Sequence, residues 1–356
     1  MILSNPVLGL RQLILRVHTG TDANLQPQGM LDNVQNAQSA YPEPTLRLNF
    51  KALNPDPQVE CIGCPGAVST WVNAVAISPD GLTFVCDHND TSLQLWDLVK
   101  RQPLLTLIGH SGMISTLAFS PDGRTVASGS YDKTIKLWDL ASRSILFTLK
   151  GHAAGVNAIA ISPNVQTLVS CSDDRTIRVW HLPHQKLLHT LKGGNAGVKS
   201  IAISPDGQTC FSGGGDRLIQ AWDLARGKLR YTLRGHQSWV TSLALSPDGQ
   251  FLVSGGNDKV IHVWNLNNGQ IINTLEGHTA PISAIALRSD GQTLFSSSRD
   301  NTIRMWSLEN GAHLRTLKGH FSYVSSSLAL DQTGKTLISG GTGIPLKIWS
   351  VTNSLG

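Results

Sequence analysis

Residues 131–140 read YDKTIKLWDL, and the same pattern of residue types returns at regular intervals along the chain. Residues 299–308, for example, read RDNTIRMWSL. The tryptophans at the eighth position of this stretch are Trp96, Trp138, Trp180, Trp222, Trp264, Trp306 and Trp349, separated by 42 residues except for a last step of 43. A fixed period of this length is the signature of a repeat architecture. The sequence therefore predicts seven copies of one structural unit.

One unit contains four short segments typical of β-strands. In the second unit these are Ile114 to Ser120, Thr125 to Ser130, Ile135 to Trp138 and Ile145 to Leu149. The first two flank the turn Ser120-Pro121-Asp122-Gly123, in which Pro presets φ and Gly accepts a positive φ. Short strands separated by turn signals indicate antiparallel sheets. Because a four-stranded sheet has two open edges, the units must pack on one another, and we expect the seven to close into a ring.

The unit resembles that of the WD-repeat β-propeller family, with a Gly-His pair followed by Ser, Asp and Trp-Asp at fixed offsets. The resemblance covers about residues 59–350. It implies an all-β fold, a seven-bladed β-propeller of four-stranded antiparallel blades. It also implies a non-catalytic scaffold or adaptor that binds protein partners on the top face of the propeller, although family membership does not name the partner.

Four units keep a His, a Ser, an Asp and the Trp. These sets are His110, Ser128, Asp132 and Trp138; His152, Ser170, Asp174 and Trp180; His236, Ser254, Asp258 and Trp264; and His278, Ser296, Asp300 and Trp306. Such side chains also make up catalytic triads, but an enzyme needs one site and not four copies, so we expect no catalytic residue. The resemblance implies a structural hydrogen-bonded tetrad that links carboxylate, imidazole, hydroxyl and indole.

Three units depart from this pattern. The first has Val68 in place of the His and Cys86 in place of the Ser. The fourth has Gly193-Gly194 in place of Gly-His, and the seventh has Gly343 at the Asp position. A buried polar network holds a turn only if every member is satisfied. We therefore expect these three units to be locally softer than the other four.

The segment after Trp349 is too short for a fourth strand in the last unit, so the ring has to be closed from upstream. We expect a propeller over residues 44–356, closed by a strand from within 45–62. Two segments qualify: Thr45 to Phe50, which alternates polar and apolar residues, and Gln58 to Ile62.

Two further segments are expected upstream of the propeller. Residues 1–18 read as a short amphipathic helix, with apolar residues at Leu3, Val7, Leu10, Ile14 and Val17. Residues 19–43 read as a flexible linker rich in Gln, Asn and Gly. The helix could dock on a protein, make peripheral contact with a membrane through residues 3–17, or serve as a transit peptide.

The candidate partner-binding residues lie at two positions that the resemblance puts at the rim of the top face. One precedes the opening residue of the first strand, and the other precedes the Asp of the turn. The Trp, Tyr, Met and Arg residues at these positions are Trp71, Met113, Tyr131, Trp239, Arg299 and Tyr323. Trp, Tyr, Met and Arg are enriched at interfaces, whereas the alternative is that these side chains pack on neighbouring loops.

The composition argues against several classes of protein, namely nucleic-acid-binding, membrane-spanning and secreted disulfide-rich proteins. The 356 residues carry a formal net charge of +5, from 29 Lys and Arg against 24 Asp and Glu, which is too small a surplus to predict nucleic-acid binding. No apolar stretch is long enough for a transmembrane helix. Five cysteines do not suggest a secreted disulfide framework, so we expect a cytoplasmic protein without a cofactor. An RNA-binding propeller and a regulatory subunit with a ligand site on the propeller are the alternatives.

Two weaker signals concern metals. Cys61 and Cys64 form a CxxC pair, a spacing found in redox and zinc sites. A zinc site needs two further ligands, and no second CxxC occurs in the sequence, which leaves open whether the two thiols form a disulfide. His181, His184 and His189 lie near the outer loop of the third unit, and we interpret them as surface residues. We therefore expect no metal site.

Overall fold

A computed structural model describes residues 59–61, 71–88, 91–318, 324–341 and 346–351. They belong to the larger of two compact units, Asn49–Gly356. The expected helix over residues 1–18, the linker over 19–43 and the candidate strand Thr45 to Phe50 lie outside the described residues. Val68, Tyr323 and Gly343 lie outside them as well.

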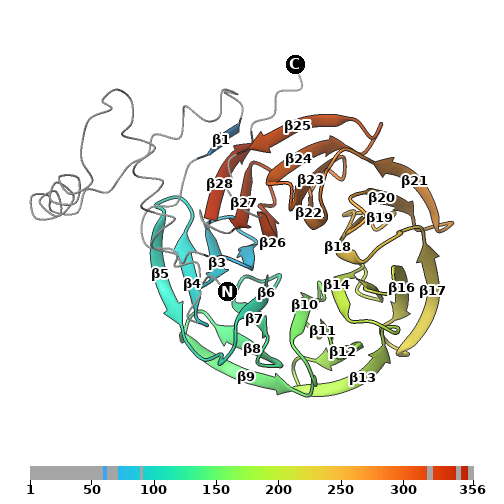
Figure 1. Ribbon diagram of the computed structural model, residues 1–356. Helices are drawn as coiled ribbons and strands as arrows, with labels where there is room; N and C mark the ends of the chain where they lie inside the picture. Colours follow the sequence, from blue (N-terminus) through green and yellow to red (C-terminus); the bar gives the residue numbers. More distant parts are fainter. Residues whose placement is uncertain (1–58, 62–70, 89–90, 319–323, 342–345, 352–356) are drawn as a thin grey trace, which may run out of the picture. The chain divides into compact units, whose positions relative to one another are not determined.

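The described residues form seven antiparallel four-stranded sheets arranged as the blades of a propeller (Figure 1). Blade 1 contains β2 (Val75–Ile77), β3 (Thr83–Asp87), β4 (Leu93–Asp97) and β5 (Gln102–Leu107); blade 2 contains β6 (Ile114–Phe119), β7 (Thr125–Ser130), β8 (Thr134–Asp139) and β9 (Ser144–Lys150). Blade 3 contains β10 (Val156–Ile161), β11 (Thr167–Ser172), β12 (Thr176–His181) and β13 (Lys186–Lys192); blade 4 contains β14 (Val198–Ile203), β15 (Thr209–Gly214), β16 (Leu218–Asp223) and β17 (Lys228–Arg234). Blade 5 contains β18 (Val240–Leu245), β19 (Phe251–Gly256), β20 (Ile261–Asn265) and β21 (Gln270–Leu275); blade 6 contains β22 (Ile282–Leu287), β23 (Thr293–Ser298), β24 (Thr302–Ser307) and β25 (His313–Lys318). The predicted all-β, seven-bladed propeller is therefore confirmed.

Blade 7 combines strands from both ends of the propeller. Its first three strands are β26 (Val324–Leu330), β27 (Thr336–Gly341) and β28 (Leu346–Val351), and its outermost strand is β1 (Val59–Cys61). β1 pairs antiparallel with β28, from Val59 opposite Val351 to Cys61 opposite Trp349. β1 thus lies within the second candidate segment, Gln58 to Ile62, and covers an edge of β28 that would otherwise be open.

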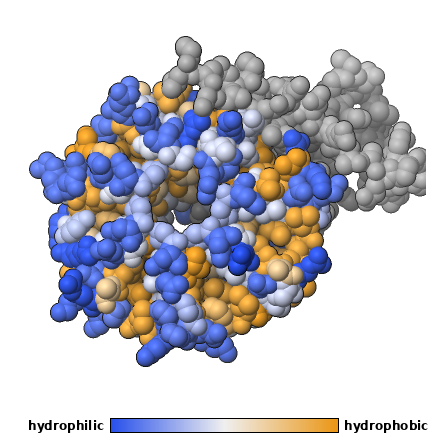
Figure 2. All heavy atoms as spheres, turned by 180° about the vertical axis from the view of Figure 1, so that it is seen from behind, coloured by the Kyte–Doolittle hydropathy of each residue, from blue (hydrophilic) through white to orange (hydrophobic). Residues whose placement is uncertain are grey.

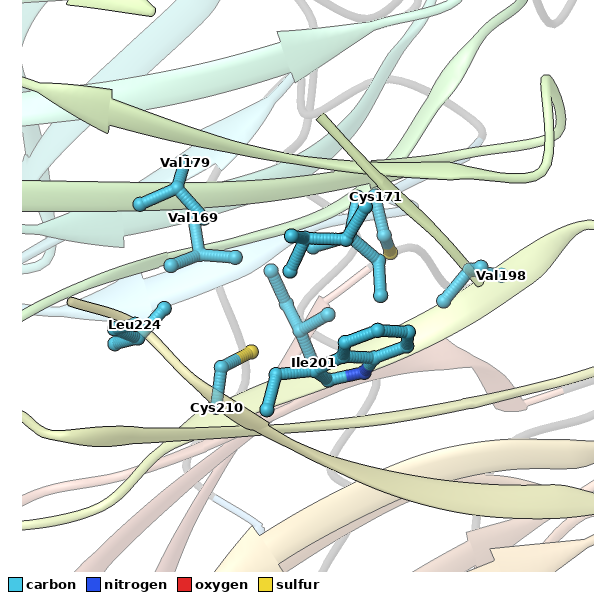
Figure 3. Close-up of a cluster of buried hydrophobic side chains, with 10 residues drawn as sticks. Val169, Cys171, Val179, Val198, Ile201, Cys210 and Leu224 are labelled. Atoms are coloured by element: carbon cyan, nitrogen blue, oxygen red, sulfur yellow. The ribbon is translucent and has the colours of Figure 1, made fainter. Parts of the chain in front are cut away.

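Apolar side chains fill the space between neighbouring blades. Figure 3 shows the cluster between blades 3 and 4, where Val169 and Cys171 of β11 face Ile201 and Cys210 of β14 and β15. Cys171 and Cys210 are completely buried free thiols, and burial raises the pKa of both. Because each blade buries its faces against its neighbours, the ring is stabilised mainly by burial of apolar surface from blade to blade.

Hydroxyl groups on the inner strands add hydrogen bonds between blades. Each accepts from a backbone N–H of the next inner strand: Thr116 from Ile159 (3.3 Å), Ser200 from Leu243 (3.0 Å), Ser242 from Ile285 (3.0 Å) and Ser327 from Val75 (2.7 Å). The last bond joins blade 7 to blade 1. It therefore ties together the two ends of the repeat array.

Candidate partner-binding face

In blade 2 the four repeated polar side chains form one continuous network. The Nδ1–H of His110 donates to Asp132 (2.7 Å), and the Ser128 hydroxyl donates to Nε2 of the same ring (2.7 Å). The indole N–H of Trp138 donates to the Ser128 oxygen (2.8 Å). This pattern uses every polar atom of the imidazole and fixes its tautomer. The arrangement matches the structural tetrad that the resemblance implies.

The other three complete sets have the same geometry. Nδ1 of the imidazole lies 2.8, 2.9 and 2.8 Å from a carboxylate oxygen in the pairs His152 with Asp174, His236 with Asp258 and His278 with Asp300. The indole N–H donates to the serine oxygen at 2.9, 2.8 and 2.8 Å in the pairs Trp180 with Ser170, Trp264 with Ser254 and Trp306 with Ser296. In the same three sets, Nε2 of the imidazole is hydrogen-bonded to the serine hydroxyl at 2.8, 2.7 and 2.8 Å. Four equivalent networks of this kind provide no unique reactive group.

The charge state of the tetrad follows from its surroundings. Burial lowers the pKa of His110, against the opposing effect of Asp132. Burial alone would raise the pKa of Asp132, but hydrogen bonds from Thr134 and His110 outweigh it and lower this pKa to about 2. The pair is therefore a neutral imidazole donating to a carboxylate at neutral pH.

The tetrad holds two surface segments together. Asp132 lies in the turn between β7 and β8, and it accepts from the backbone N–H of Ser111, in the loop before β6, and from that of Thr134, the first residue of β8. We use the term top face for the loops that precede the inner strands together with the turns between the second and third strands. The tetrads thus fix the loops of the top face to its turns.

The incomplete tetrads of blades 1 and 4 leave a buried nitrogen without a described hydrogen-bond partner in one case and a carboxyl group with a raised pKa in the other. In blade 1, where Cys86 replaces the Ser, the buried indole nitrogen of Trp96 finds no hydrogen-bond partner among the described residues. In blade 4, Gly194 replaces the His, and burial raises the pKa of Asp216 instead of the net lowering seen at Asp132. Trp222 still donates to its serine, Ser212, at 2.8 Å.

The two predicted rim positions are bonded to each other in blades 2 to 6. The backbone N–H of the residue before the turn Asp donates to the carbonyl of the residue before the inner strand. The pairs are Tyr131 with Met113 (2.9 Å), Asp173 with Gly155 (3.3 Å), Gly215 with Gly197 (3.0 Å), Asn257 with Trp239 (2.8 Å) and Arg299 with Pro281 (3.0 Å). These bonds position both residues on the rigid sheet of their blade.

Neighbouring blades also contact each other through these positions. A Cβ added to Gly155 would meet the ring of Tyr131, and one added to Gly215 would lie 3.5 Å from Cε2 of Trp239. At both blade junctions, a large side chain therefore lies against a glycine of the adjacent blade. Together with the backbone bonds, these contacts join the rims of blades 2 and 3 and the rims of blades 4 and 5.

The rim side chains pack on their neighbours and are still substantially open to solvent. Trp71, Met113, Tyr131 and Trp239 are 48, 41, 51 and 48% exposed, and Arg299 is exposed as well. Tyr323, the sixth predicted residue, lies outside the described residues. Tyr131 and Trp239 thus pack beside a glycine of the adjacent blade and keep about half of their surface exposed to solvent.

Sequence reasoning missed Lys199, which belongs to the same surface. Its ammonium group forms an ion pair with Asp173 and lies 5.7 Å from the ring centroid of Trp239. The available signal was its position directly after Val198, the opening residue of its inner strand, where the other blades have uncharged residues. Lys199 links the rims of blades 3, 4 and 5.

The centre of the ring is a cavity of about 300 Å³, seen as the hollow in Figure 2. Equivalent inner-strand positions line it: Asn73, Ser115, Asn157, Lys199, Thr241 and Ser283. Several of these side chains are engaged with the backbone, as when Asn157 donates to Val198 and Thr241 to Ile282, both at 2.8 Å. Among the described residues that line the cavity, Lys199 is the one ionisable group, so no acid and base converge there.

The described residues contain no group of three or more His, Cys, Asp and Glu side chains arranged to hold a metal ion. The rings of His181 and His184 stack at 4.7 Å, and Nε2 of His189 donates to the Ala225 carbonyl at 3.2 Å. Cys64 and the side chain of Cys61 lie outside the described part of the chain. No helix that could span a membrane is found in the described segments.

Comparison with known proteins identifies the repeat. The family model "WD domain, G-beta repeat" matches residues 60–97, 101–139, 143–181, 185–223, 227–265, 269–307 and 311–343. A search of the curated proteins found no significant match. The matched segments cover well over half of the chain and recur once per blade. The chain therefore belongs to the family of WD domain, G-beta repeat proteins.

Proposed function

We propose that this protein is a non-catalytic scaffold that binds protein partners on the top face of its propeller. The observation that carries the proposal is the half-exposed state of Trp71, Tyr131 and Trp239, the last two of which lie at rim positions fixed by backbone hydrogen bonds. Trp and Tyr dominate the binding energy of protein interfaces. Side chains that are already ordered lose little conformational entropy when a partner binds.

The chemistry of the tetrads and of the central cavity supports a binding role over catalysis. The tetrads repeat four times, and burial lowers the pKa of His110 and His152, which favours neutral rings held in a fixed tautomer. The described lining of the central cavity consists mainly of small polar or apolar side chains. A general acid and a general base within reach of one substrate are what most hydrolytic mechanisms require. This surface offers contact area instead.

The buried thiols bear on the compartment. Cys171 and Cys210 are free and buried in the described part of the chain. Free thiols persist in reducing compartments, so we propose that the scaffold works in the cytoplasm.

The test is a comparison of two triple variants. The first, Trp71→Ala, Tyr131→Ala and Trp239→Ala, removes the aromatic rings of the rim. The control, Leu104→Ala, Leu146→Ala and Ile272→Ala, removes side chains that are each 48% exposed on the outer strands. Affinity purification with quantitative mass spectrometry should recover the same partners with wild type and the control, and should lose them with the rim variant. Equal recovery with all three proteins would contradict the proposal.

A further inference from the structure

We propose that the partner presents an acidic peptide segment, whose carboxylates pair with an arc of four basic side chains on the top face: Lys133, Arg175, Arg217 and Lys259. This inference rests on the proposed function, because it names the chemistry of the partner that the rim binds. The four residues occupy the same turn position in blades 2, 3, 4 and 5. All four are exposed, and none forms an ion pair with a described carboxylate.

The backbone conformation does not explain basic residues at this position. Lys133, Arg175, Arg217 and Lys259 have positive φ angles of 70, 68, 68 and 73°. The left-handed region favours Gly and Asn, and a long side chain gains nothing there from the backbone. Blade 6 has Asn301 at the equivalent position, with a φ of 67°. The local turn would thus accept an uncharged residue in every blade.

The negative charges of the top face are largely buried or already paired. Three of the arc residues follow a tetrad carboxylate directly in the sequence. These carboxylates are Asp132, Asp174 and Asp258, and their side chains are 8, 7 and 10% exposed. In the described loops and turns of this face, the exposed carboxylates are Asp173, which is paired with Lys199, and Glu276. A carboxylate that approaches the surface therefore meets the basic side chains first.

The same arrangement favours a peptide over a nucleic acid. The buried tetrad carboxylates cancel much of the positive charge at long range, because a charge a few ångströms below the surface still contributes to the distant field. Binding of a long polyanion depends on that extended field and on the release of many counterions. A peptide with a few carboxylates needs only short-range pairs.

The aromatic rim provides an apolar contact beside the arc. Tyr131 precedes Lys133 with only Asp132 between them, and the Trp239 ring lies 3.5 Å from where a Cβ on Gly215, two residues before Arg217, would be. A segment that pairs with the arc can therefore place an apolar side chain against either ring. The predicted ligand is an acidic peptide that also carries apolar residues.

The experiment selects ligands without assuming their sequence. A displayed library of random peptides is selected on the full-length protein, and the affinity of a labelled, selected peptide is measured by fluorescence anisotropy. The arc variant is Lys133→Ser, Arg175→Ser, Arg217→Ser and Lys259→Ser. The control variant is Arg124→Ser, Arg143→Ser, Lys186→Ser and Lys228→Ser, which removes four exposed basic residues from the opposite ends of the strands. Thermal melts verify that both variants fold.

We expect the selected peptides to be enriched in Asp and Glu, and their affinity to fall by about tenfold or more in the arc variant while the control stays near wild type. The inference is overturned if the peptides show no acidic excess, if both variants bind alike, or if a labelled oligouridine binds the arc more tightly than the peptides do. Selected peptides without acidic residues that lose affinity in the Trp71, Tyr131 and Trp239 variant would overturn this inference alone and leave the proposed function standing.

Discussion

The ring of Tyr131 in blade 2 occupies the space that a side chain at position 155 in blade 3 would need. Residue 155 is a glycine, and its backbone carbonyl accepts a hydrogen bond from Asp173 of its own blade (3.3 Å). Gly155 thus packs against Tyr131 of blade 2, and its carbonyl is hydrogen-bonded within blade 3. The exposed aromatic surface is therefore coupled to the propeller and does not stand on a mobile loop.

This contact predicts a coupling between positions 131 and 155. Gly155→Ala should destabilise the protein by about 1–3 kcal/mol, because the added methyl group overlaps the Tyr131 ring and forces it to move. In a Tyr131→Ala background the same substitution should cost much less. Urea unfolding of the two single variants and the double variant measures the difference. Additive effects would show that the ring does not depend on the glycine.

The tetrads predict different effects on stability for substitutions at two equivalent carboxylates, Asp132 and Asp216. Asp132→Asn places an NH₂ group against donors that now bond the carboxylate, and should destabilise the protein by about 1–3 kcal/mol. Asp216→Asn should be neutral or slightly stabilising, because Asp216 has no imidazole partner and burial already disfavours its charge. Unfolding free energies at about pH 7 measure both changes. Equal losses would mean that the carboxylate acts without the histidine.

The incomplete tetrads predict where the ring opens first. Blade 1 has a buried indole nitrogen at Trp96 without a described partner, and blade 4 has Gly194 in place of the His. We expect backbone amides of blades 1, 4 and 7 to exchange hydrogen faster than those of blades 2, 3, 5 and 6, because local opening breaks fewer bonds there. Peptide-level hydrogen exchange reports this. Uniform protection around the ring would contradict it.

A buried carboxylate in blade 1 predicts an unusual dependence of stability on pH. Burial raises the pKa of Asp87 to about 6, although the backbone N–H groups of Asn73 and Ala74 donate to it. Because this pKa is above the unfolded value of about 3.9, the favourable contribution of Asp87 is fully present below about pH 4 and is lost as the pH rises through about 6.

Asp87→Asn should therefore raise the free energy of unfolding at about pH 7.5 and change it little at about pH 4. Unfolding of wild type and variant in urea across this range provides the test. Asp132 is the internal comparison, since its pKa is lowered to about 2 and its contribution is lost as the pH falls from about 4 towards 2. A gain from Asp87→Asn that is the same at every pH would disprove the assignment to Asp87.

The sequence predicts the features that recur in several repeats and misses the features that occur in only one blade. The tetrad of Trp138 is recognisable because its four members return at fixed offsets in other blades. The contact of Tyr131 with Gly155 depends on which blades are neighbours, and the buried Asp87 has no equivalent in the pattern. Lys199 looks like one substitution among small polar residues until the fold places it beside Asp173 and Trp239.

The choice of closing strand shows the same limit. Thr45 to Phe50 alternates polar and apolar residues, Gln58 to Ile62 is a second short segment that qualifies as a strand, and the sequence pattern alone does not decide which of the two closes the ring. What distinguishes them is tertiary pairing, because β28 offers a single open edge, and β1 supplies Val59 to Cys61 opposite Val351 to Trp349.

Closure by β1 predicts a cooperative loss of the whole ring when this strand is removed. Deletion of residues 44–63 should expose the edge of β28 and lower the melting temperature in one transition, because each blade is buried only against its neighbours and blade 7 bonds to blade 1 through Ser327 and Val75. Deletion of residues 1–43, which spares β1, is the control and should melt like the full chain. Thermal unfolding followed by circular dichroism separates the two deletions. A protein that lacks residues 44–63 and melts like the control would show that the ring holds without its upstream strand.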